Sequence, residues 1–211
     1  MKYRWIDAYL LAKPAVIKDF KQEWNWIRYR IGGKMFAAVL LDESGAPYSI
    51  NLKLEPMEGA FLRQQYEDIL PGYYSNKQHW NSVRADGAVP DALLMDMLDQ
   101  SYALVLHGLS KKKQRELLIT TYCGLDCAGC EWKEKARCGG CVDTGGLPFH
   151  CQDVPCPIAA CAIGKAIPFC GMCEAYPCGL LNDYSCDPEH GDTPPGARIK
   201  ACQMIRSLLS L

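Results

Sequence analysis

The first half of the chain has a pattern of hydrophobic and polar positions that predicts a helix followed by a sheet. Residues 3–13 place apolar side chains at helical spacing and stop at Pro14, which predicts a short helix. Over 24–31 the side chains alternate in polarity, as is typical of a half-buried strand. Residues 34–41 and 48–54 predict two more strands, each following a glycine-containing turn. Three consecutive antiparallel strands are the simplest arrangement.

The rest of this half predicts two helices and one more strand. A helical stretch that ends at Pro71-Gly72 is expected to have a buried side formed by Phe61, Leu62, Gln65, Tyr66 and Ile69. A short strand follows at 81–84, and a long helix occupies about 90–109. Residues 110–113 are predicted to form an exposed linker. The predicted order is α-β-β-β-α-β-α, an α+β fold with helices on one face of an antiparallel sheet.

Beyond residue 118 the periodicity weakens and the composition changes. All 13 cysteines lie between Cys123 and Cys202, among many glycines and prolines. So sharp a change predicts two domains, at 1–118 and 119–211. Two short helices are expected in the second, at 157–165 and 197–209.

Composition predicts a globular protein, and the net charge gives no general case for nucleic-acid or membrane binding. The chain has 211 residues, of which 49% are hydrophobic and 22% charged, and its formal charge is −1. The first domain has 16 Lys and Arg against 14 Asp and Glu, and the second has 7 against 10. The N-terminus lacks the apolar core of a signal peptide, and no stretch approaches the length of a membrane span. A cytoplasmic protein is therefore expected, in a compartment where stable disulfides are rare.

The cysteine spacing predicts metal binding. Three Cys-x-x-Cys pairs stand at 127/130, 138/141 and 170/173, and two such turns can supply the tetrahedral sulfur shell that zinc prefers. A loop-rich domain with a small apolar core also needs such cross-links. We expect two or three structural zinc ions. The predicted ligands are Cys123, Cys127, Cys130, Cys138, Cys141, Cys156, Cys161, Cys170, Cys173 and Cys178.

Metal identity and ligand pairing stay open at this point. The spacing Cys123-x3-Cys127-x2-Cys130 matches the pattern that holds the iron–sulfur cluster of radical-SAM enzymes, but only 81 residues follow it, and Gly129 stands where an aromatic residue is usual. An iron–sulfur or thiol-based redox protein is therefore the alternative to structural zinc. One possible pairing has two sites, formed by Cys127, Cys130, Cys138 and Cys141 and by Cys161, Cys170, Cys173 and Cys178; interleaved pairing is equally possible.

The first half resembles the MmcQ/YjbR family over nearly its whole length. The motifs that carry the resemblance are Gly32-Gly33-Lys34-Met35-Phe36, Asn51-Leu52-Lys53, Pro71-Gly72-Tyr73, Asn76-Lys77-Gln78-His79-Trp80-Asn81 and Ser101-Tyr102. The resemblance implies a compact α+β fold similar to that of frataxin (CyaY). The family is often described as DNA-binding because of its fold, which is an analogy and not a mechanism.

The second half resembles a cysteine-rich family of unknown function that is suspected of binding zinc. The motifs that carry this resemblance are Tyr122-Cys123-Gly124-Leu125-Asp126-Cys127-x2-Cys130, Cys138-x2-Cys141, Cys156-x4-Cys161-Ala162 and Phe169-Cys170-x2-Cys173-x3-Pro177-Cys178. The resemblance covers ten cysteines, and it implies no activity. Cys151, Cys186 and Cys202 lie outside the pattern.

Six residues of the first domain are candidates for ligand binding, because they combine positive charge, a titratable ring and a stacking surface. They are Lys34, Lys53, Asn76, Lys77, His79 and Trp80. If they share a face, they suit nucleic acid or a protein partner; otherwise Trp80 belongs to the core and the lysines are simply solvated. No catalytic motif is present, so a binding protein is favoured over an enzyme.

Overall fold

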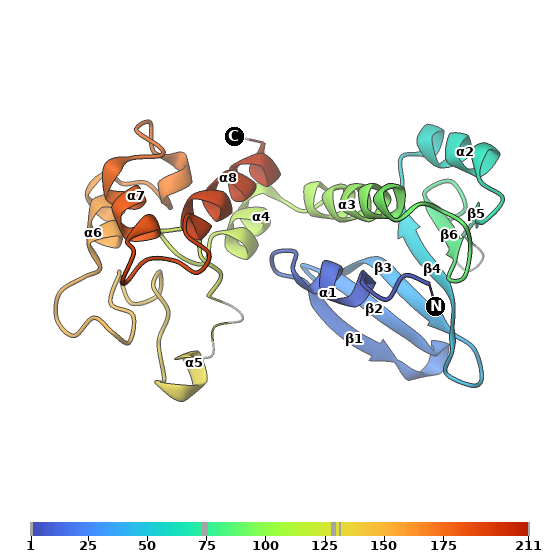
Figure 1. Ribbon diagram of the computed structural model, residues 1–211, viewed down its shortest axis with the longest axis horizontal. Helices are drawn as coiled ribbons and strands as arrows, with labels where there is room; N and C mark the ends of the chain where they lie inside the picture. Colours follow the sequence, from blue (N-terminus) through green and yellow to red (C-terminus); the bar gives the residue numbers. More distant parts are fainter. Residues whose placement is uncertain (1, 73–75, 128–129, 131, 211) are drawn as a thin grey trace. The chain divides into compact units, whose positions relative to one another are not determined.

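The computed structural model describes residues 2–72, 76–127, 130 and 132–210 (Figure 1). Tyr73 and Gly129, which were named above, lie outside the described residues. The chain forms two compact units, Met1–Lys113 and Gln114–Leu211. The described residues of both units include no helix with the length and apolar character that crossing a membrane requires.

Unit 1 is a six-stranded antiparallel sheet in the order β1-β2-β3-β4-β6-β5, with three α-helices. The α+β fold with an antiparallel sheet is thus confirmed. The strands are β1 Ile17–Lys21, β2 Trp26–Ile31, β3 Lys34–Leu41, β4 Pro47–Lys53, β5 Ile69–Pro71 and β6 Trp80–Arg84. The helices are α1 Ile6–Leu11, α2 Pro56–Gln65 and α3 Asp91–His107, with a 3-10 turn, η1, at Gln22–Trp24.

One face of the sheet holds the apolar core of unit 1. Residues that pair across antiparallel strands share a face, and one row across four strands consists of Ile27, Val39, Ile50 and Val83. Helix α3 packs here: the Ser101 hydroxyl donates a hydrogen bond to the backbone oxygen of Phe36 at 2.5 Å, and the Phe36 ring meets Tyr102 edge to face at 5.5 Å. Helix α1 packs on α3, with the Tyr9 hydroxyl donating to Asp99 at 2.6 Å.

The opposite face of the sheet carries more polar rows. One row crosses the same four strands and consists of Trp26, Leu40, Ser49 and Arg84. Trp26 packs with Ala38 and Leu40 in a small apolar cluster, against which Met35 lies. Residues of this face line two cavities.

The two edge strands differ in character. On β1, the Asp19 carboxylate accepts a hydrogen bond from Arg28 Nε at 2.7 Å and pairs with Arg30 as well. Because Arg28 hydrogen-bonds this carboxylate, the pKa of Asp19 is lowered. At the other edge, β5 has three residues and ends at Pro71.

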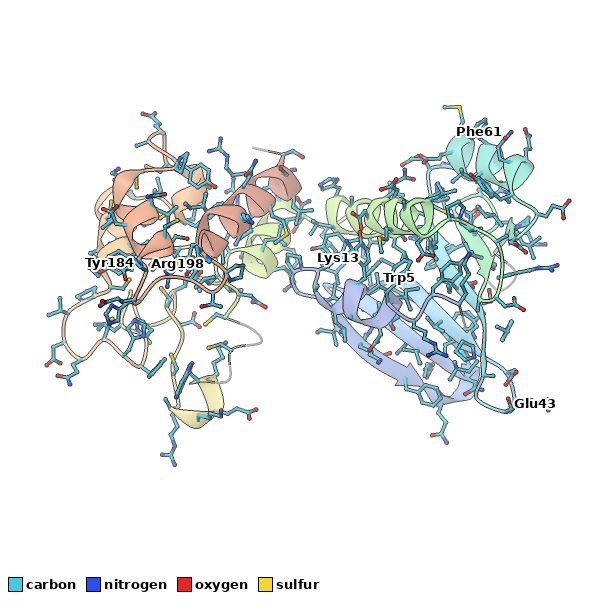
Figure 2. All side chains as sticks on the ribbon, in the orientation of Figure 1. Trp5, Lys13, Glu43, Phe61, Tyr184 and Arg198 are labelled. Carbon is cyan, nitrogen blue, oxygen red and sulfur yellow. The ribbon has the colours of Figure 1, made fainter. Side chains whose placement is uncertain are left out.

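The structure corrects the predicted elements at several places. Strands β1 and β5 were not predicted. Helix α2 ends at Gln65, well before the expected Pro71, so Ile69 lies in a strand. Phe61 is 59% exposed (Figure 2) and Gln65 is exposed as well, whereas Leu62 is buried as expected, together with Gly59. Residues 111–113, expected as a linker, begin helix α4.

Unit 2 consists of short helices joined by long connections. The helices are α4 Lys111–Leu118, which spans the division between the units, α5 Trp132–Lys135, α6 Pro157–Gly164, α7 Gly179–Cys186 and α8 Ala197–Leu209, with a 3-10 turn, η2, at Cys170–Met172. The two helices predicted in this half, α6 and α8, are present.

The buried interior of unit 2 is small and gathers around α6, η2 and α8. Phe169 and Cys202 are fully buried there. Two glycines are required by this packing. A Cβ on Gly124, whose φ is +87°, would lie 2.6 Å from the Cys202 sulfur, and a Cβ on Gly171 would lie 2.2 Å from the Phe169 ring. In this core, the backbone at Gly124 and Gly171 therefore packs directly against Cys202 and Phe169, and neither position has room for a side chain.

Candidate metal centre and ligand-binding residues

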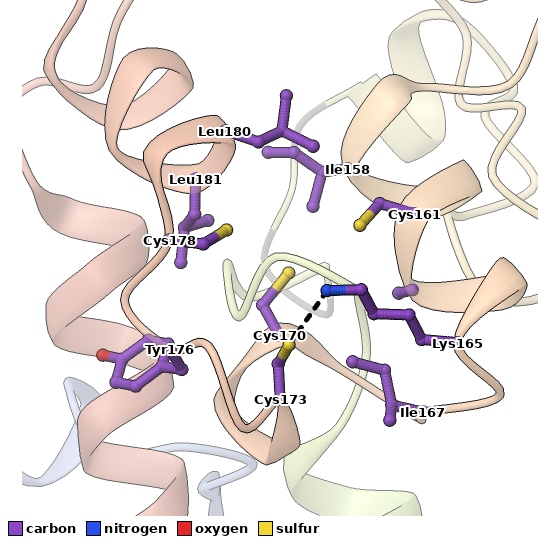
Figure 3. Close-up of a pocket in the computed structure, with 11 residues that line it drawn as sticks. Ile158, Cys161, Lys165, Ile167, Cys170, Cys173, Tyr176, Cys178, Leu180 and Leu181 are labelled. Carbon is purple, nitrogen blue, oxygen red and sulfur yellow. Dashed lines mark hydrogen bonds between the residues drawn. The ribbon is translucent and has the colours of Figure 1, made fainter.

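Four cysteines line one small cavity in unit 2 (Figure 3). Cys161 is supplied by α6 and Cys170 by η2, while Cys173 directly follows η2 and Cys178 directly precedes α7. Their spacing in the sequence is wide, but the turn at η2 and the ends of two helices bring the four thiols to the same cavity. Its volume is about 10 Å³, which is roughly the space that one water-sized particle occupies. We call these four residues the sulfur cluster.

The electrostatics of the sulfur cluster favour a cation. The Lys165 ammonium donates a hydrogen bond to the Cys173 sulfur at 3.4 Å, and this bond raises the pKa of Lys165 (Figure 3). Burial, together with the neighbouring cysteines Cys123, Cys178, Cys161 and Cys173, raises the pKa of the Cys170 thiol to about 12. Several adjacent thiolates therefore need a positive charge among them in order to coexist.

A second group of cysteines gathers around Cys141. Burial, together with the neighbouring cysteines Cys123, Cys156 and Cys127, raises the pKa of Cys141 to about 11. The sulfur of Cys127 would lie 3.8 Å from a Cβ placed on Gly140. Within the described ranges, no three Cys, His, Asp or Glu side chains stand in the arrangement of an assembled metal site. The two groups are therefore sets of nearby donors that a metal would have to draw together.

The remaining cysteines have more local surroundings. The Cys138 sulfur accepts a hydrogen bond from the backbone N–H of Phe149 at 3.4 Å, while the backbone N–H of Cys130 bonds to the oxygen of Cys127 at 3.4 Å. The Cys202 thiol is fully buried and lies 3.2 Å from the backbone oxygen of Cys123, to which it donates. All 13 cysteines are among the described residues, and none of them forms a disulfide.

The six candidate ligand-binding residues of unit 1 have four different placements. Lys34 begins β3, Lys53 ends β4 and His79 directly precedes β6, so the antiparallel pairing places these three at the same end of the sheet. Lys77 lines a cavity of about 640 Å³. The Asn76 side chain accepts a hydrogen bond from the backbone N–H of Gln78 at 2.9 Å, which gives it a structural role in the turn.

Trp80 is placed differently from the expectation of a stacking surface. It is only 9% exposed, and the Lys53 ammonium lies 5.4 Å from the centre of its ring. Trp80 thus serves as a support for Lys53. The exposed aromatic side chains near the polar face of the sheet are Trp24 (52%) and Tyr48 (46%), which the motif analysis did not select.

Comparison with known proteins relates both units to described families. The family model YjbR matches residues 11–104. YjbR of Escherichia coli O157:H7 is 32% identical over 111 residues, which are 53% of this chain and 92% of that protein. The chain belongs to the YjbR family. YbdF of the same organism is 41% identical over 90 residues, 42% of this chain and 71% of that protein. The crystal structure of Deinococcus radiodurans protein DR2400, family-model domain DUF419, covers 53% of this chain and 84% of its own, with 31% identity and a TM-score of 0.49.

The YjbR relatives match the first unit, and a second family accounts for most of the cysteines. The model for Protein of unknown function (DUF3795) matches residues 119–183. This YjbR-family chain therefore joins a YjbR domain to a DUF3795 domain, as the two resemblances predicted. The range includes all four residues of the sulfur cluster, and it ends before Cys186 and Cys202.

Sequence reasoning missed two features of the sulfur cluster and its neighbours. Lys165 was not selected, although it lies four residues after Cys161 and so falls on the same side of α6. The association of Cys141 with Cys123 and Cys156 was also missed, because it depends on the path of long connections that have no periodic signal.

Proposed function

We propose that this chain is a two-domain binding protein of the cytoplasm whose cysteine-rich unit is stabilised by zinc bound to cysteine thiolates. The observation that carries the proposal is the sulfur cluster, where four thiols from three neighbouring elements line a cavity with room for one small particle. The Cys123, Cys127, Cys141 and Cys156 group is the candidate for a second ion. Cys130 and Cys138 remain candidate ligands from the sequence pattern.

The donor set of the sulfur cluster fits structural zinc. Zinc takes four thiolates in a closed tetrahedral shell with Zn–S distances of about 2.3 Å, and it supplies no redox chemistry. Four cysteines leave no open coordination position, so a catalytic role for such an ion is not favoured. When bound, zinc would supply the positive charge that lets the four sulfurs ionise together. In that arrangement Lys165 would sit beside the site as a second cation that donates to sulfur.

Purified protein is expected to contain two or three zinc ions per chain and no visible absorption. Elemental analysis of protein purified without oxygen measures the zinc content, and an absorption spectrum measures the visible absorption. Strong chelators should remove the metal and lower the helix signal of unit 2 in circular dichroism, because metal binding and folding are coupled in small metal-bound domains. Brown protein that contains iron would replace zinc by an iron–sulfur cluster. A folded protein that contains no metal and keeps its structure in the presence of chelators would refute both the zinc and the iron–sulfur assignments.

The proposed ligand of unit 1 is nucleic acid or a protein partner. Lys34 and Lys53, with His79 at the same end of the sheet, support this proposal, since the two lysine ammonium groups can contact phosphate or carboxylate groups. The Trp80 ring holds the Lys53 ammonium in place and gives it a defined position. Such a site would bind through charge more than through base stacking.

If nucleic acid is the ligand, a single-stranded oligonucleotide should bind at about 50 mM salt and more weakly at about 200 mM. The double variant Lys34→Ala, Lys53→Ala should lose roughly tenfold in affinity, as measured by fluorescence anisotropy with a labelled oligonucleotide. The matched control is Lys111→Ala, Lys112→Ala, which removes the same charge from α4. Equal losses in both double variants would mean that only net charge matters. Lack of binding at low salt would leave a protein partner as the proposal.

A further inference from the structure

The larger of the two cavities on the polar face of the sheet combines aromatic and acidic walls. It has a volume of about 790 Å³ and lies where η1 leads into β2, beside the loop between β3 and β4. A volume of that size is within the range of pockets that bind small molecules. Its lining includes three aromatic and three acidic residues, which are Trp24, Trp26, Tyr48, Glu23, Asp42 and Glu43. We call this cavity the aromatic pocket.

Three aromatic rings form the aromatic pocket from different elements. Trp24 ends η1, Trp26 begins β2 and Tyr48 belongs to β4. The Trp24 and Trp26 rings lie 5.2 Å apart at 62° to each other, so they present two differently oriented surfaces. Trp26 is 6% exposed and fixed in the apolar cluster, whereas Trp24 and Tyr48 are about half exposed. A rigid wall and two accessible rings are therefore available to a ligand.

The Trp24 ring already attracts positively charged groups. The Lys21 ammonium lies 5.7 Å from the ring centre, and the Arg28 guanidinium carbon lies 5.8 Å from it. Both distances are within the range of cation–π attraction. Each of these cations is also paired with a carboxylate, Lys21 with Glu23 at 2.9 Å and Arg28 with Asp19 at 2.7 Å. The Trp24 ring therefore already contacts two cations, Lys21 and Arg28, and a carboxylate balances the charge of each.

All the charged residues that line the aromatic pocket are acidic, namely Glu23, Asp42 and Glu43. The Asp42 carboxylate is committed to its turn, since it accepts hydrogen bonds from the backbone N–H groups of Ser44 and Ala46, both at 2.9 Å. Glu43 lies on the exposed loop between β3 and β4, at the end of unit 1 labelled in Figure 2. Among the described residues, the lining contains neither Lys nor Arg. Lys21 balances Glu23 and Asp19 balances Arg28, so Asp42 and Glu43 leave this wall of the pocket with a negative charge that favours a cation.

We propose that the aromatic pocket binds an organic cation, of the class of alkylated ammonium ions. A quaternary or methylated ammonium is bulky and weakly hydrated, so it gains from aromatic faces and needs no directed hydrogen bonds. A metal ion would instead require several converging oxygen ligands, and Asp42 is used within its turn. A phosphate-bearing ligand is disfavoured by the carboxylates of Asp42 and Glu43. The aromatic pocket is thus a site distinct from the sulfur cluster and from Lys34, Lys53 and Lys77.

Choline and its neutral isostere 3,3-dimethylbutan-1-ol test this proposal on the full chain. The two probes have the same shape and differ in charge, and isothermal titration calorimetry measures both. We expect choline to bind at least about tenfold more tightly than the alcohol, and Trp24→Ala to weaken choline binding by about tenfold. Trp24→Phe, which keeps a ring, should stay within about threefold of the parent chain. Trp132→Ala, which removes an exposed tryptophan of unit 2, should leave the affinity unchanged.

Glu43→Gln provides a test that does not depend on the stability of the tryptophan variants. Glu43 is on an exposed loop, so its substitution should preserve the fold and weaken choline binding by about two- to fivefold, more so at low salt. Glu67→Gln, at another exposed acidic position of unit 1, is the matched control and should have no effect. Equal affinity for choline and the alcohol, no binding of choline, or identical effects of the two glutamate substitutions would overturn the proposal.

Discussion

Cys170→Ser is expected to prevent stable folding of unit 2. Cys170 lies in the sulfur cluster, beside the buried residues of η2 and α8. A serine hydroxyl is a poor zinc ligand, so the affinity of this site for zinc should fall by at least about a hundredfold, more than the loss of an outer-shell partner typically causes. Structural zinc contributes on the order of 10–16 kcal/mol in small metal-bound domains, so the apolar interior of unit 2 would not compensate for its loss.

The matched control is Cys186→Ser. Cys186 is exposed, lies outside the sulfur cluster and has its thiol 3.8 Å from the Asn182 side chain. This variant should keep the metal content and the hydrogen-exchange protection of the parent chain. Metal analysis and hydrogen exchange of peptides from 157–186 measure both variants. Cys170→Ser protein with full metal content and unchanged protection would remove Cys170 from the ligand set.

Phe36→Ala is expected to destabilise unit 1 by about 3–5 kcal/mol, a large part of the stability of an ordinary domain. Phe36 is fully buried and meets Tyr102 of α3 edge to face at 5.5 Å. Removal of its ring would leave a cavity between the sheet and α3. Denaturant unfolding followed by tryptophan fluorescence measures the loss.

Phe20→Ala is the control for this prediction. Phe20 is 54% exposed on the edge strand β1, so its truncation should change the free energy of unfolding by less than about 1 kcal/mol. Similar losses in the two variants would contradict the placement of the core between α3 and the central strands.

The parts of unit 1 that could be predicted from the sequence are those whose hydrophobic pattern has a clear period. Strand β3, Lys34–Leu41, has the predicted bounds, and α3, Asp91–His107, lies within the predicted range of about 90–109. Strand β1 was missed because its sequence, IKDFK, mixes apolar and charged side chains at an exposed edge. Strand β5 has three residues, too few for any period to be recognised.

The sites were less predictable, because side-chain function depends on burial and on long connections. Cysteine spacing suggested the group Cys161, Cys170, Cys173 and Cys178, and these four residues line the same cavity. Their role as metal ligands stays a prediction. Trp80 was selected for its place in a motif, yet it is buried, while Trp24 is exposed at the end of a 3-10 turn that periodicity cannot locate. The left-handed conformation of Asn25, at φ +57°, directs this turn, and Asn is among the residues that tolerate it.

The two edge strands restrict how other molecules can engage unit 1. At one edge β5 offers only three residues, the last of which is a proline without an N–H donor. At the other, β1 presents Lys18, Asp19 and Lys21, and charged side chains of this kind discourage an incoming strand. Neither edge strand is therefore well suited to pair with an additional β-strand. Recognition by β-augmentation, and stacking of copies edge to edge, are therefore both disfavoured for this sheet.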